Sequence, residues 1–281
     1  MVLAAVGQIC STANISHNLG QCRTIIQMAV AAGAKVLFLP EAADYIGSSP
    51  SESLSLCKPV TSSSFVLGLQ EEASRHRLPI NVGIHEPGDN PKKLRNTLVH
   101  ISEEGKITQR YQKLHLFDMN KSDGPKMKES DSAERGSTIV PPFDSPVGKI
   151  GMAICFDLRF PEMGLALKRQ KADIILYPAA FALDTGKLHW HALLKARAIE
   201  TQCYVIAAAQ NGAHNEKRSS YGHSIVISPW GEVVKELSGC EGKESEAGEP
   251  EIMVVDIDHD YLTRIRTEVP LMRRTDVYAE V

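Results

Sequence analysis

Residues 147–163 read VGKIGMAICFDLRFPEM, an apolar run of strand character that ends in a thiol, an acid and a cation. Pro161 and Glu162 follow as a helix start, because proline is tolerated in the first helical turn. Cys155 therefore lies on a predicted strand-to-helix turn, and such turns line the ligand crevice of open α/β sheets. The pattern makes Cys155 a candidate nucleophile. The alternative is a buried structural cysteine, which is common in protein cores.

The bulk composition is that of an ordinary globular protein, with 281 residues of which 43% are hydrophobic and 23% charged. We expect a single domain over residues 1–281, because no linker, internal repeat or low-complexity tract divides the chain. The net charge of −3 gives no reason to expect binding to nucleic acid or to an anionic membrane surface. No apolar run approaches the roughly 18 residues of a membrane span.

Cysteine usage and the N-terminal residues bear on the compartment. The six cysteines are scattered without a Cys-x-x-Cys pair, which fits a reducing compartment better than a disulfide framework. The first residues lack the basic and long apolar regions of a signal peptide and read as a strand. We therefore expect a cytoplasmic protein, and the sequence leaves a mitochondrial location open as well.

Apolar periodicity predicts strands and helices in mixed order. Strands are expected at residues 3–9, 35–39, 80–85, 97–102, 107–114, 173–177, 204–209, 224–228, 232–237 and 252–257. Helices are expected at residues 17–32, 65–77, from 161 onward, 188–201 and 260–266, with a loop or short helix at 48–64 and a polar loop at 119–138. Two sets of apolar strands with helices between them indicate an α/β fold built as a layered sandwich.

Three charged residues are candidates to act with the thiol. Glu41 follows the strand at 35–39, where apolar surroundings should raise the pKa of its carboxyl group, as a general base requires. The alternative is a solvated acid at a strand end. Lys113 lies on the predicted strand among largely apolar neighbours, and Glu129 lies in the loop sequence KMKES. Taken alone, each of these two reads as an ordinary surface charge.

The phrases FLPE, YQKLHLF, KES and ICFDLRFPE, in this order, resemble the nitrilase superfamily of carbon-nitrogen hydrolases. Further phrases place the likeness in its Nit branch and nearest to the amidases of deaminated glutathione: HLFD, ARAIETQCYVIAAAQNGAHN, SYGHSIVISPWG and RRTDVY. The resemblance covers nearly the whole chain. It implies a four-layer αββα sandwich that pairs through a symmetric interface into an αββααββα homodimer.

The resemblance also implies roles for the candidate residues. By position, the Glu-Lys-Cys triad of the family falls on Glu41, Lys113 and Cys155, and its supporting second glutamate falls on Glu129. Amide hydrolysis needs a thiolate attacker, so a neighbouring base must take the proton of a thiol that is only slightly ionised at neutral pH. Glu41 would take that proton, and Lys113 would stabilise the oxyanion together with the backbone N–H of Phe156. Glu129 would fix Lys113 in place.

Three further residues are candidates for substrate binding. Arg159 is the candidate carboxylate anchor, because its planar guanidinium binds carboxylates through two hydrogen bonds. An internal salt bridge to Asp157, Glu162 or another acid is the alternative. Tyr45 and Thr185 follow predicted strands, where their hydroxyl groups would complete recognition of the substrate.

The resemblance implies a small-molecule 2-oxo acid amide as substrate. This is glutathione whose glutamyl amine has become a ketone, which would be cleaved to 2-oxoglutarate and cysteinylglycine. An ω-amidase activity on 2-oxoglutaramate is the alternative within the branch, and simple amides or nitriles are alternatives within the superfamily. A non-catalytic binding protein on the same fold is disfavoured, because all four key positions hold the required residue types.

The histidines and the missing motifs argue against cofactor chemistry. His189 and His191 are two residues apart on a predicted helix and point to different faces, unlike the i, i+4 pair of a helical metal site. We expect one to pack and the other to form a hydrogen bond. His115 and His223 are expected in core or supporting positions. The chain has no Gly-x-Ser-x-Gly, Gly-x-Gly-x-x-Gly or Walker motif, so neither a cofactor nor a metal is expected.

Overall fold

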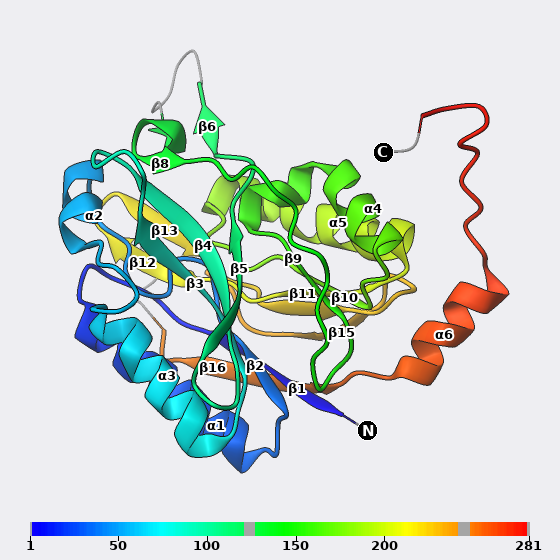
Figure 1. Ribbon diagram of the computed structural model, residues 1–281, viewed down its shortest axis with the longest axis horizontal. Coiled ribbons are helices and arrows are strands. Elements are labelled where there is room, and N and C mark those ends of the chain that lie inside the picture. Colours follow the sequence, from blue (N-terminus) through cyan, green and yellow to red (C-terminus); the bar gives the residue numbers. More distant parts are fainter. Residues whose placement is uncertain (1, 121–126, 241–247, 280–281) are drawn as a thin grey trace.

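Two β-sheets packed face to face form the centre of the structure, a computed structural model that describes residues 2–120, 127–240 and 248–279 (Figure 1). Helices α1 (Ile15–Ala31) and α3 (Ser64–His76) cover the outer side of the first sheet. Helices α4 (Pro161–Arg169) and α5 (Leu183–Thr201) cover the outer side of the second. The layers are therefore those of the predicted αββα sandwich.

The first sheet has the strand order β16-β1-β2-β3-β4-β5, with β8 pairing to β4. Its strands are β1 (Leu3–Gln8), β2 (Val36–Phe38), β3 (Ile80–Pro87), β4 (Leu94–Ile101), β5 (Ile107–Gln112), β8 (Ala133–Glu134) and β16 (Glu251–Asp256). Strands β1, β2 and β3 run parallel. Successive side chains alternate between the two faces: Val36 and Phe38 face the other sheet, and Leu37 joins the core under α1 and α3.

The second sheet has the order β15-β14-β11-β10-β9. Its strands are β9 (Ile150–Met152), β10 (Ile174–Leu176), β11 (Tyr204–Ala207), β14 (Ile225–Ile227) and β15 (Val233–Glu236). The first three in the chain are parallel to one another, and the last two are antiparallel additions. Trp190, Leu194 and Ala198 on α5 are fully buried against this layer, so the inward stripe of that helix anchors it to the sheet.

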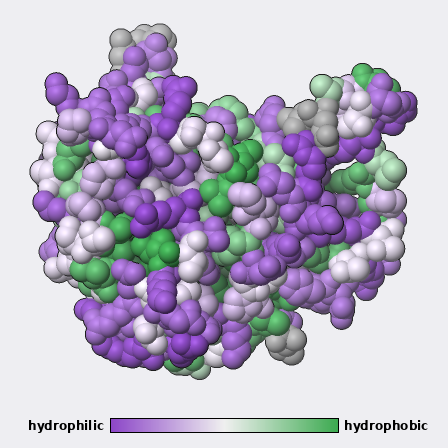
Figure 2. Space-filling model, in the orientation of Figure 1, coloured by the Kyte–Doolittle hydropathy of each residue, from purple (hydrophilic) through white to green (hydrophobic). Residues whose placement is uncertain are grey.

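Short elements connect the layers and extend beyond them. They are α2 (Pro50–Leu56), the hairpin β6 (Asp118–Met119) and β7 (Met127–Lys128), the 3-10 turns η1 (Glu129–Asp131) and η2 (Cys155–Arg159), the hairpin β12 (Asn211–Asn215) and β13 (Arg218–Tyr221), and α6 (His259–Glu268). The chain beyond α6 projects from the body of the protein (Figure 1). The surface in this view is mostly hydrophilic, with separate hydrophobic patches (Figure 2). Within the described ranges, no helix combines the length and apolar character needed to cross a membrane.

The order of the major elements matches the sequence prediction, with local differences. The hairpin β12–β13 was not predicted, because its residues are mostly polar. Of the loop expected at 119–138, residues 121–126 lie outside the described residues, and the rest contains short strands and η1. Helix α5 begins at Leu183 and not at 188. Its first turns carry few apolar residues, and Gly186 lies so close to Tyr221 that a Cβ would come within 2.4 Å of the ring.

The site residues lie where parallel strands end. Strand β2 leads to Glu41, β9 leads to Cys155, and β10 leads to Ala180. Because the two sheets pack face to face, these strand ends meet at one edge of the sandwich, where hydrogen bonds join Glu41 to both later segments. The fold thus brings together side chains that are far apart in the sequence.

Candidate active site

Cys155 is the first residue of the 3-10 turn η2, three residues after β9 ends. Its φ of 46° is in the left-handed region, which is uncommon for a residue other than glycine and costs about 1–3 kcal/mol. Its backbone N–H donates to the carbonyl of Pro178 at 2.9 Å, which ties the turn to the end of the neighbouring strand. The thiol is therefore held at the sheet edge by a strained turn, as the sequence predicted for a strand-to-helix connection.

Glu41 lies between the thiol and the ammonium group of Lys113. Its Oε1 accepts hydrogen bonds from Lys113 Nζ at 3.0 Å and from Asn96 Nδ2 at 2.7 Å. Its Oε2 accepts from the backbone N–H of Ala180 at 2.8 Å. The Cys155 thiol also hydrogen-bonds to this carboxylate. The carboxylate is thus in direct contact with the proton that it would have to accept.

Lys113 lies one residue beyond β5, not on the strand where we expected it. Its Nζ donates to Glu129 Oε2 at 2.9 Å as well as to Glu41. Its backbone N–H donates to the carbonyl of Asn96 at 2.9 Å. Cys155, Glu41 and Lys113 are 9%, 4% and 2% exposed, so Lys113 is a buried cation between two carboxylates and not an ordinary surface charge.

Glu129 opens the 3-10 turn η1 within the region that we expected to be a loop. The backbone N–H of Phe117 donates to its Oε2 at 2.7 Å, and its own N–H donates to the Phe117 carbonyl at 3.1 Å. Both contacts fix the carboxylate that holds Lys113. The structure therefore brings all four predicted residues into one hydrogen-bonded cluster.

Asn96 on β4 belongs to this cluster and was missed by the sequence reasoning. Its Nδ2 donates both to Glu41 Oε1 at 2.7 Å and to Glu129 Oε1 at 3.2 Å. Its Oδ1 is buried without a hydrogen-bond partner in the described structure. The feature of the sequence that could have indicated Asn96 is an amide side chain within the strand sequence LRNTLVHI, whose other residues are mostly apolar.

The surroundings of the cluster shift three pKa values. Burial alone would raise the pKa of Glu41, but the charge of Lys113 and the hydrogen bonds from Asn96 and Cys155 outweigh it, and the pKa is lowered. This corrects our expectation of a raised pKa, which considered burial without these partners. Burial opposes the charge of Lys113, yet Glu129 and Glu41 raise its pKa well above the usual value.

Burial and then the charge of Glu41 raise the pKa of Cys155 well above the usual value, and Lys113 offsets this only in part. At neutral pH the cluster therefore contains a neutral thiol, an ionised Glu41 and a charged Lys113. The backbone N–H of Ala180 also hydrogen-bonds to the sulfur and favours the thiolate. The site thus needs a base to take the proton.

Asp157 is completely buried and fixes the turn η2 through its hydrogen bonds. Its carboxylate accepts from the Tyr111 hydroxyl at 2.7 Å, from the Ile154 N–H at 2.9 Å and from His115 Nδ1 at 2.7 Å. The His115 ring stacks on Phe160 with 3.6 Å between ring centroids. His115 thus has the supporting position that we expected.

Arg159, at the end of η2, is half-buried and pairs with no carboxylate of the described residues. Its Nη2 donates to Nδ1 of His189 at 2.9 Å. Its guanidinium carbon lies 5.7 Å and 5.9 Å from the ring centroids of Phe156 and Phe181. The alternative of an internal salt bridge is therefore wrong, because Asp157 is satisfied by other donors. The guanidinium keeps further N–H groups for an anion.

The remaining predicted substrate contacts differ in their geometry. The hydroxyl of Tyr45 donates to the Ser53 carbonyl at 2.9 Å, and that of Thr185 donates to the Ala182 carbonyl at 3.2 Å in the first turn of α5. Neither hydroxyl is the free group at the mouth of the site that we expected, because a nearby carbonyl already accepts from it. The backbone N–H of Phe156 has no acceptor among the described residues, so it is available to an oxyanion.

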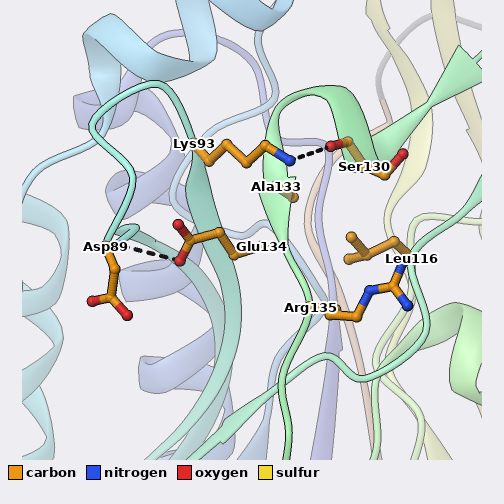
Figure 3. A pocket seen from close by; sticks show the side chains of 7 residues that line it. All are labelled: Asp89, Lys93, Leu116, Ser130, Ala133, Glu134 and Arg135. Carbon is orange, nitrogen blue, oxygen red and sulfur yellow. Dashed lines mark hydrogen bonds between the residues drawn. The ribbon is translucent and has the colours of Figure 1, made fainter.

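A cavity of about 380 Å³ lies beside the turn that carries Glu129 (Figure 3). It is lined by Asp89, Lys93, Leu116, Ser130, Ala133, Glu134 and Arg135. Lys93 Nζ donates to the Ser130 carbonyl at 2.8 Å, which ties η1 to the start of β4. None of the four clustered residues lines this cavity, so it is not the place where the amide would be cleaved.

The histidines of α5 take different partners. His189 contacts Arg159, whereas Nε2 of His191 lies 2.9 Å from Oε1 of Glu236. Both therefore form hydrogen bonds, and our expectation that one would only pack is wrong. Within the described ranges, one group of side chains could hold a metal ion, namely His191, His223 and Glu236. It shares no residue with the cluster around Cys155.

Comparisons with known proteins support the same fold and chemistry. The sequence profile described as carbon-nitrogen hydrolase matches residues 3–267. The chain is 43% identical over 282 residues to a probable hydrolase, nit2, of Schizosaccharomyces pombe, with 100% of both chains covered. It is 41% identical over 286 residues to the deaminated glutathione amidase of Mus musculus, with coverage of 99% of this chain and 85% of the mouse protein.

Solved structures show the same architecture. The NitFhit protein of C. elegans superposes with a TM-score of 0.89 at 35% identity, over 99% of this chain and 66% of that longer one. Nit3 of Saccharomyces cerevisiae, described as a member of branch 10 of the nitrilase superfamily, superposes with a TM-score of 0.82 at 28% identity, over 97% of this chain and 96% of the yeast protein. The predicted sandwich fold and the resemblance that suggested it are confirmed.

Proposed function

The chain belongs to the carbon-nitrogen hydrolase family and is a hydrolase that acts on amides, and from that premise we propose that it cleaves deaminated glutathione through a cysteinyl thioester. The products would be 2-oxoglutarate and cysteinylglycine. The observation that carries the choice of a 2-oxo acid amide is Arg159, a half-buried guanidinium that has no carboxylate partner in the described structure and lies four residues from the proposed nucleophile. Among such amides, the name of the mouse relative favours deaminated glutathione.

The first step is attack by Cys155 on the amide carbon. Glu41 accepts the thiol proton through their existing hydrogen bond as the S–C bond forms. Because the pKa of the thiol is raised and that of Glu41 is lowered, transfer before substrate binds is uphill. We therefore place the proton transfer together with the attack, where the developing charge on the amide oxygen offsets its cost.

The second step is collapse of the tetrahedral intermediate. Its oxyanion would accept hydrogen bonds from Lys113 Nζ and the free N–H of Phe156, and one such donor is typically worth about 2.7–4 kcal/mol of barrier. Glu41 returns its proton to the leaving nitrogen, the C–N bond breaks, and cysteinylglycine departs with a neutral amine. The acyl group remains on Cys155 as a thioester.

The third step is hydrolysis of the thioester. Glu41, again ionised, takes a proton from a water molecule whose oxygen attacks the thioester carbon. The same oxyanion donors stabilise the second intermediate, whose collapse breaks the C–S bond. The proton on Glu41 passes to the sulfur, which restores the thiol of Cys155. Throughout the reaction, the hydrogen bond to Glu129 holds Lys113 in place and the hydrogen bond from Asn96 holds Glu41 in place.

Arg159 would hold the 2-oxo acid end of the substrate. A carboxylate can accept two parallel N–H donors from a guanidinium, and one nitrogen of Arg159 is oriented by His189. Because a guanidinium can only donate, Nδ1 of His189 is the acceptor of this hydrogen bond. The rings of Phe156 and Phe181 beside the guanidinium limit its motion and its exposure to water.

The second candidate substrate is 2-oxoglutaramate, which has the same 2-oxo acid end and would release ammonia. Arg159 supports both substrates equally. The two differ only in the leaving group, and so a comparison of rates must separate them. This alternative stays within the same mechanism.

The test is a panel of amides assayed with one enzyme preparation. We expect kcat/KM to be highest on deaminated glutathione, lower on 2-oxoglutaramate, and lowest on simple aliphatic amides and nitriles. Turnover is measured as 2-oxoglutarate by coupled reduction for the two 2-oxo acid amides and as ammonia for the simple amides and nitriles, and Cys155→Ala serves as the blank for contaminating activity. Highest kcat/KM on uncharged amides or on nitriles would refute the proposed substrate while leaving the amidase chemistry in place.

A homodimer is part of the proposal. It is supported by exposed apolar side chains on and beside α5, where Leu188, Ile199 and Trp230 are 74%, 53% and 51% exposed. A Cβ on Gly231 would lie 2.6 Å from Ile199, so helix and loop form one continuous surface. Light scattering after size-exclusion chromatography should report twice the 30.8 kDa chain mass, and Leu188→Lys should shift the protein toward monomer. A wild-type monomer at micromolar concentration would contradict the dimer.

A further inference from the structure

A second cluster of chemically active side chains lies on the outer side of the second sheet. Oε1 of Glu236 is 2.9 Å from His191 Nε2 and 2.6 Å from His223 Nδ1. One potential ligand atom from each residue lies within 4.8 Å of the other two. Both imidazoles thus aim a nitrogen at the same carboxylate oxygen.

Rigid elements hold the three side chains. His191 projects from the middle of α5, and Glu236 ends β15. The backbone of His223 is fixed on both sides, since its N–H donates to the Ser238 carbonyl at 3.0 Å and its carbonyl accepts from Trp190 Nε1 at 2.8 Å. Convergence of the three side chains therefore does not depend on a flexible loop.

The packing around His223 restricts its ring further. Its φ is 58°, in the left-handed region. Its ring lies 4.2 Å from that of Tyr221, centroid to centroid, and its imidazole occupies the place where a side chain on Gly239 would stand. A larger residue at Gly239 would displace the imidazole. The position of this histidine is therefore set by its surroundings on several sides.

The donor set fits a borderline divalent cation. Zinc binds imidazole nitrogen and carboxylate oxygen at about 2.0–2.2 Å, commonly in a tetrahedron with three protein ligands and one open position. Adjacent ligand atoms in such a tetrahedron are about 3.3 Å apart. The N···O distances of 2.9 and 2.6 Å would have to widen by about 0.4 and 0.7 Å to admit the ion. Magnesium and calcium prefer sites made of oxygen ligands, so two imidazoles disfavour them.

Access and protonation are also compatible with metal entry. The side chains of His191, His223 and Glu236 are 34%, 21% and 27% exposed, so the fourth position is open to water. In the hydrogen-bonded form the two ring nitrogens donate protons to the carboxylate. On metal binding each of these nitrogens loses its proton and becomes a ligand. Each neutral ring then carries its one proton on the other nitrogen, and any excess proton passes to water.

We propose that His191, His223 and Glu236 form a zinc-binding site with water as the fourth ligand, separate from the amide-cleaving cluster. The ion would join the middle of α5 to the end of β15 and to His223, two residues before β14. Its role would be to clamp this helix onto the sheet. The proposal does not depend on the identity of the amide substrate.

The test is zinc binding to the full chain after removal of adventitious metal with a chelator. Calorimetry should find one saturable site per chain, and zinc should raise the midpoint of thermal unfolding. X-ray absorption should show a shell of nitrogen and oxygen at about 2.0–2.1 Å with no sulfur near 2.3 Å. This readout separates the proposed site from the free cysteines, which also attract zinc.

Two variants and one control identify the ligands. His191→Ala and Glu236→Gln should each weaken zinc binding by more than tenfold, since loss of even an outer partner of a metal ligand typically costs about 10–100-fold. His17→Ala, at an exposed position on α1, should bind as the wild type does. Circular dichroism checks the fold of each variant, and Glu236→Gln keeps the shape of the side chain.

Three outcomes would overturn the proposal: no saturable binding, a sulfur shell in the wild-type spectrum, or unchanged affinity in both variants. The wild-type spectrum decides even if a variant does not fold. Amide turnover is not part of the readout, so this test can fail or succeed independently of the proposed function.

Discussion

Asn96 offers a sharp test of the cluster, because it contacts both glutamates without being a proposed proton carrier. Asn96→Leu removes both donated hydrogen bonds and keeps a branched side chain of similar size. The Oδ1 atom has no partner among the described residues, so its loss breaks no bond. What the substitution removes is the donation from Nδ2 to Glu41 at 2.7 Å and to Glu129 at 3.2 Å.

The expected magnitude follows from the charge on the acceptors. A hydrogen bond to an ionised group contributes about 1.5–3 kcal/mol. Of the two bonds, only the shorter one, from Asn96 to Glu41, reaches the residue that changes protonation during turnover. Loss of that bond removes one of the contacts that orient the Glu41 carboxylate toward the thiol, and should lower kcat/KM by at most about 10–150-fold. The raised proton affinity of Glu41 makes it a somewhat stronger base, which favours the lower end of that range.

The sign of the pH effect can also be worked out. Asn96 favours the ionised form of Glu41 and so contributes to its lowered pKa. In Asn96→Leu that pKa should rise, and the acid limb of the kcat/KM profile, which reports the free enzyme, should move to higher pH. The alkaline limb should stay where it is in the wild type.

The assay is the full pH profile of kcat/KM for wild type and variant, with Asn81→Leu as the matched control. Asn81 is a buried asparagine on the neighbouring strand β3, and its Oδ1 contacts His100 Nδ1 at 3.1 Å. The control should lose stability but keep the wild-type acid limb. An acid limb in Asn96→Leu that coincides with that of the wild type, with kcat/KM changed less than twofold, would refute the reasoning.

Three other substitutions test the remaining roles. Cys155→Ala should abolish turnover and the acyl-enzyme seen by mass spectrometry while its circular dichroism stays that of the wild type; residual turnover would place the nucleophile elsewhere. Lys113→Ala should lower kcat by about 100–1000-fold as an oxyanion donor is lost, and an effect confined to KM would contradict that role. Arg159→Ala should lower kcat/KM on 2-oxo acid amides by about 10–150-fold, the cost of a charge-assisted hydrogen bond. Equal losses on uncharged amides would remove its assignment as anchor.

The strand ends were the part of the site that sequence alone could locate. Apolar runs of limited length end at Pro40 and before Cys155, and in a parallel sheet such ends share one edge. The likeness of motifs then supplied Lys113 and Glu129, which composition and periodicity would have left as surface charges. The structure brings these residues into contact, while their chemical roles stay predictions that the substitutions above examine.

Other features depend on contacts that no local pattern encodes. Asn96 looks like one polar residue on a strand until two glutamates from distant segments reach it. The partner of Arg159 proved to be His189, because Tyr111, Ile154 and His115 already satisfy the nearer Asp157. The hydroxyls of Tyr45 and Thr185 donate to the carbonyls of Ser53 and Ala182. These local hydrogen bonds compete with substrate binding, and the position of the two residues after a strand does not reveal them.

The charges of the cluster explain why its thiol stays protonated until an amide binds. Lys113 lowers the pKa of Glu41 by holding its Oε1, so the base is weakest while the site is empty. The oxyanion that develops during attack would compete with Glu41 for the ammonium group of Lys113. This competition would weaken the hydrogen bond between Lys113 and Glu41. The proton affinity of Glu41 would then rise during attack on the amide, when the thiol must lose its proton. Activation of Cys155 would thus be coupled to the presence of a polarised carbonyl, through one shared cation.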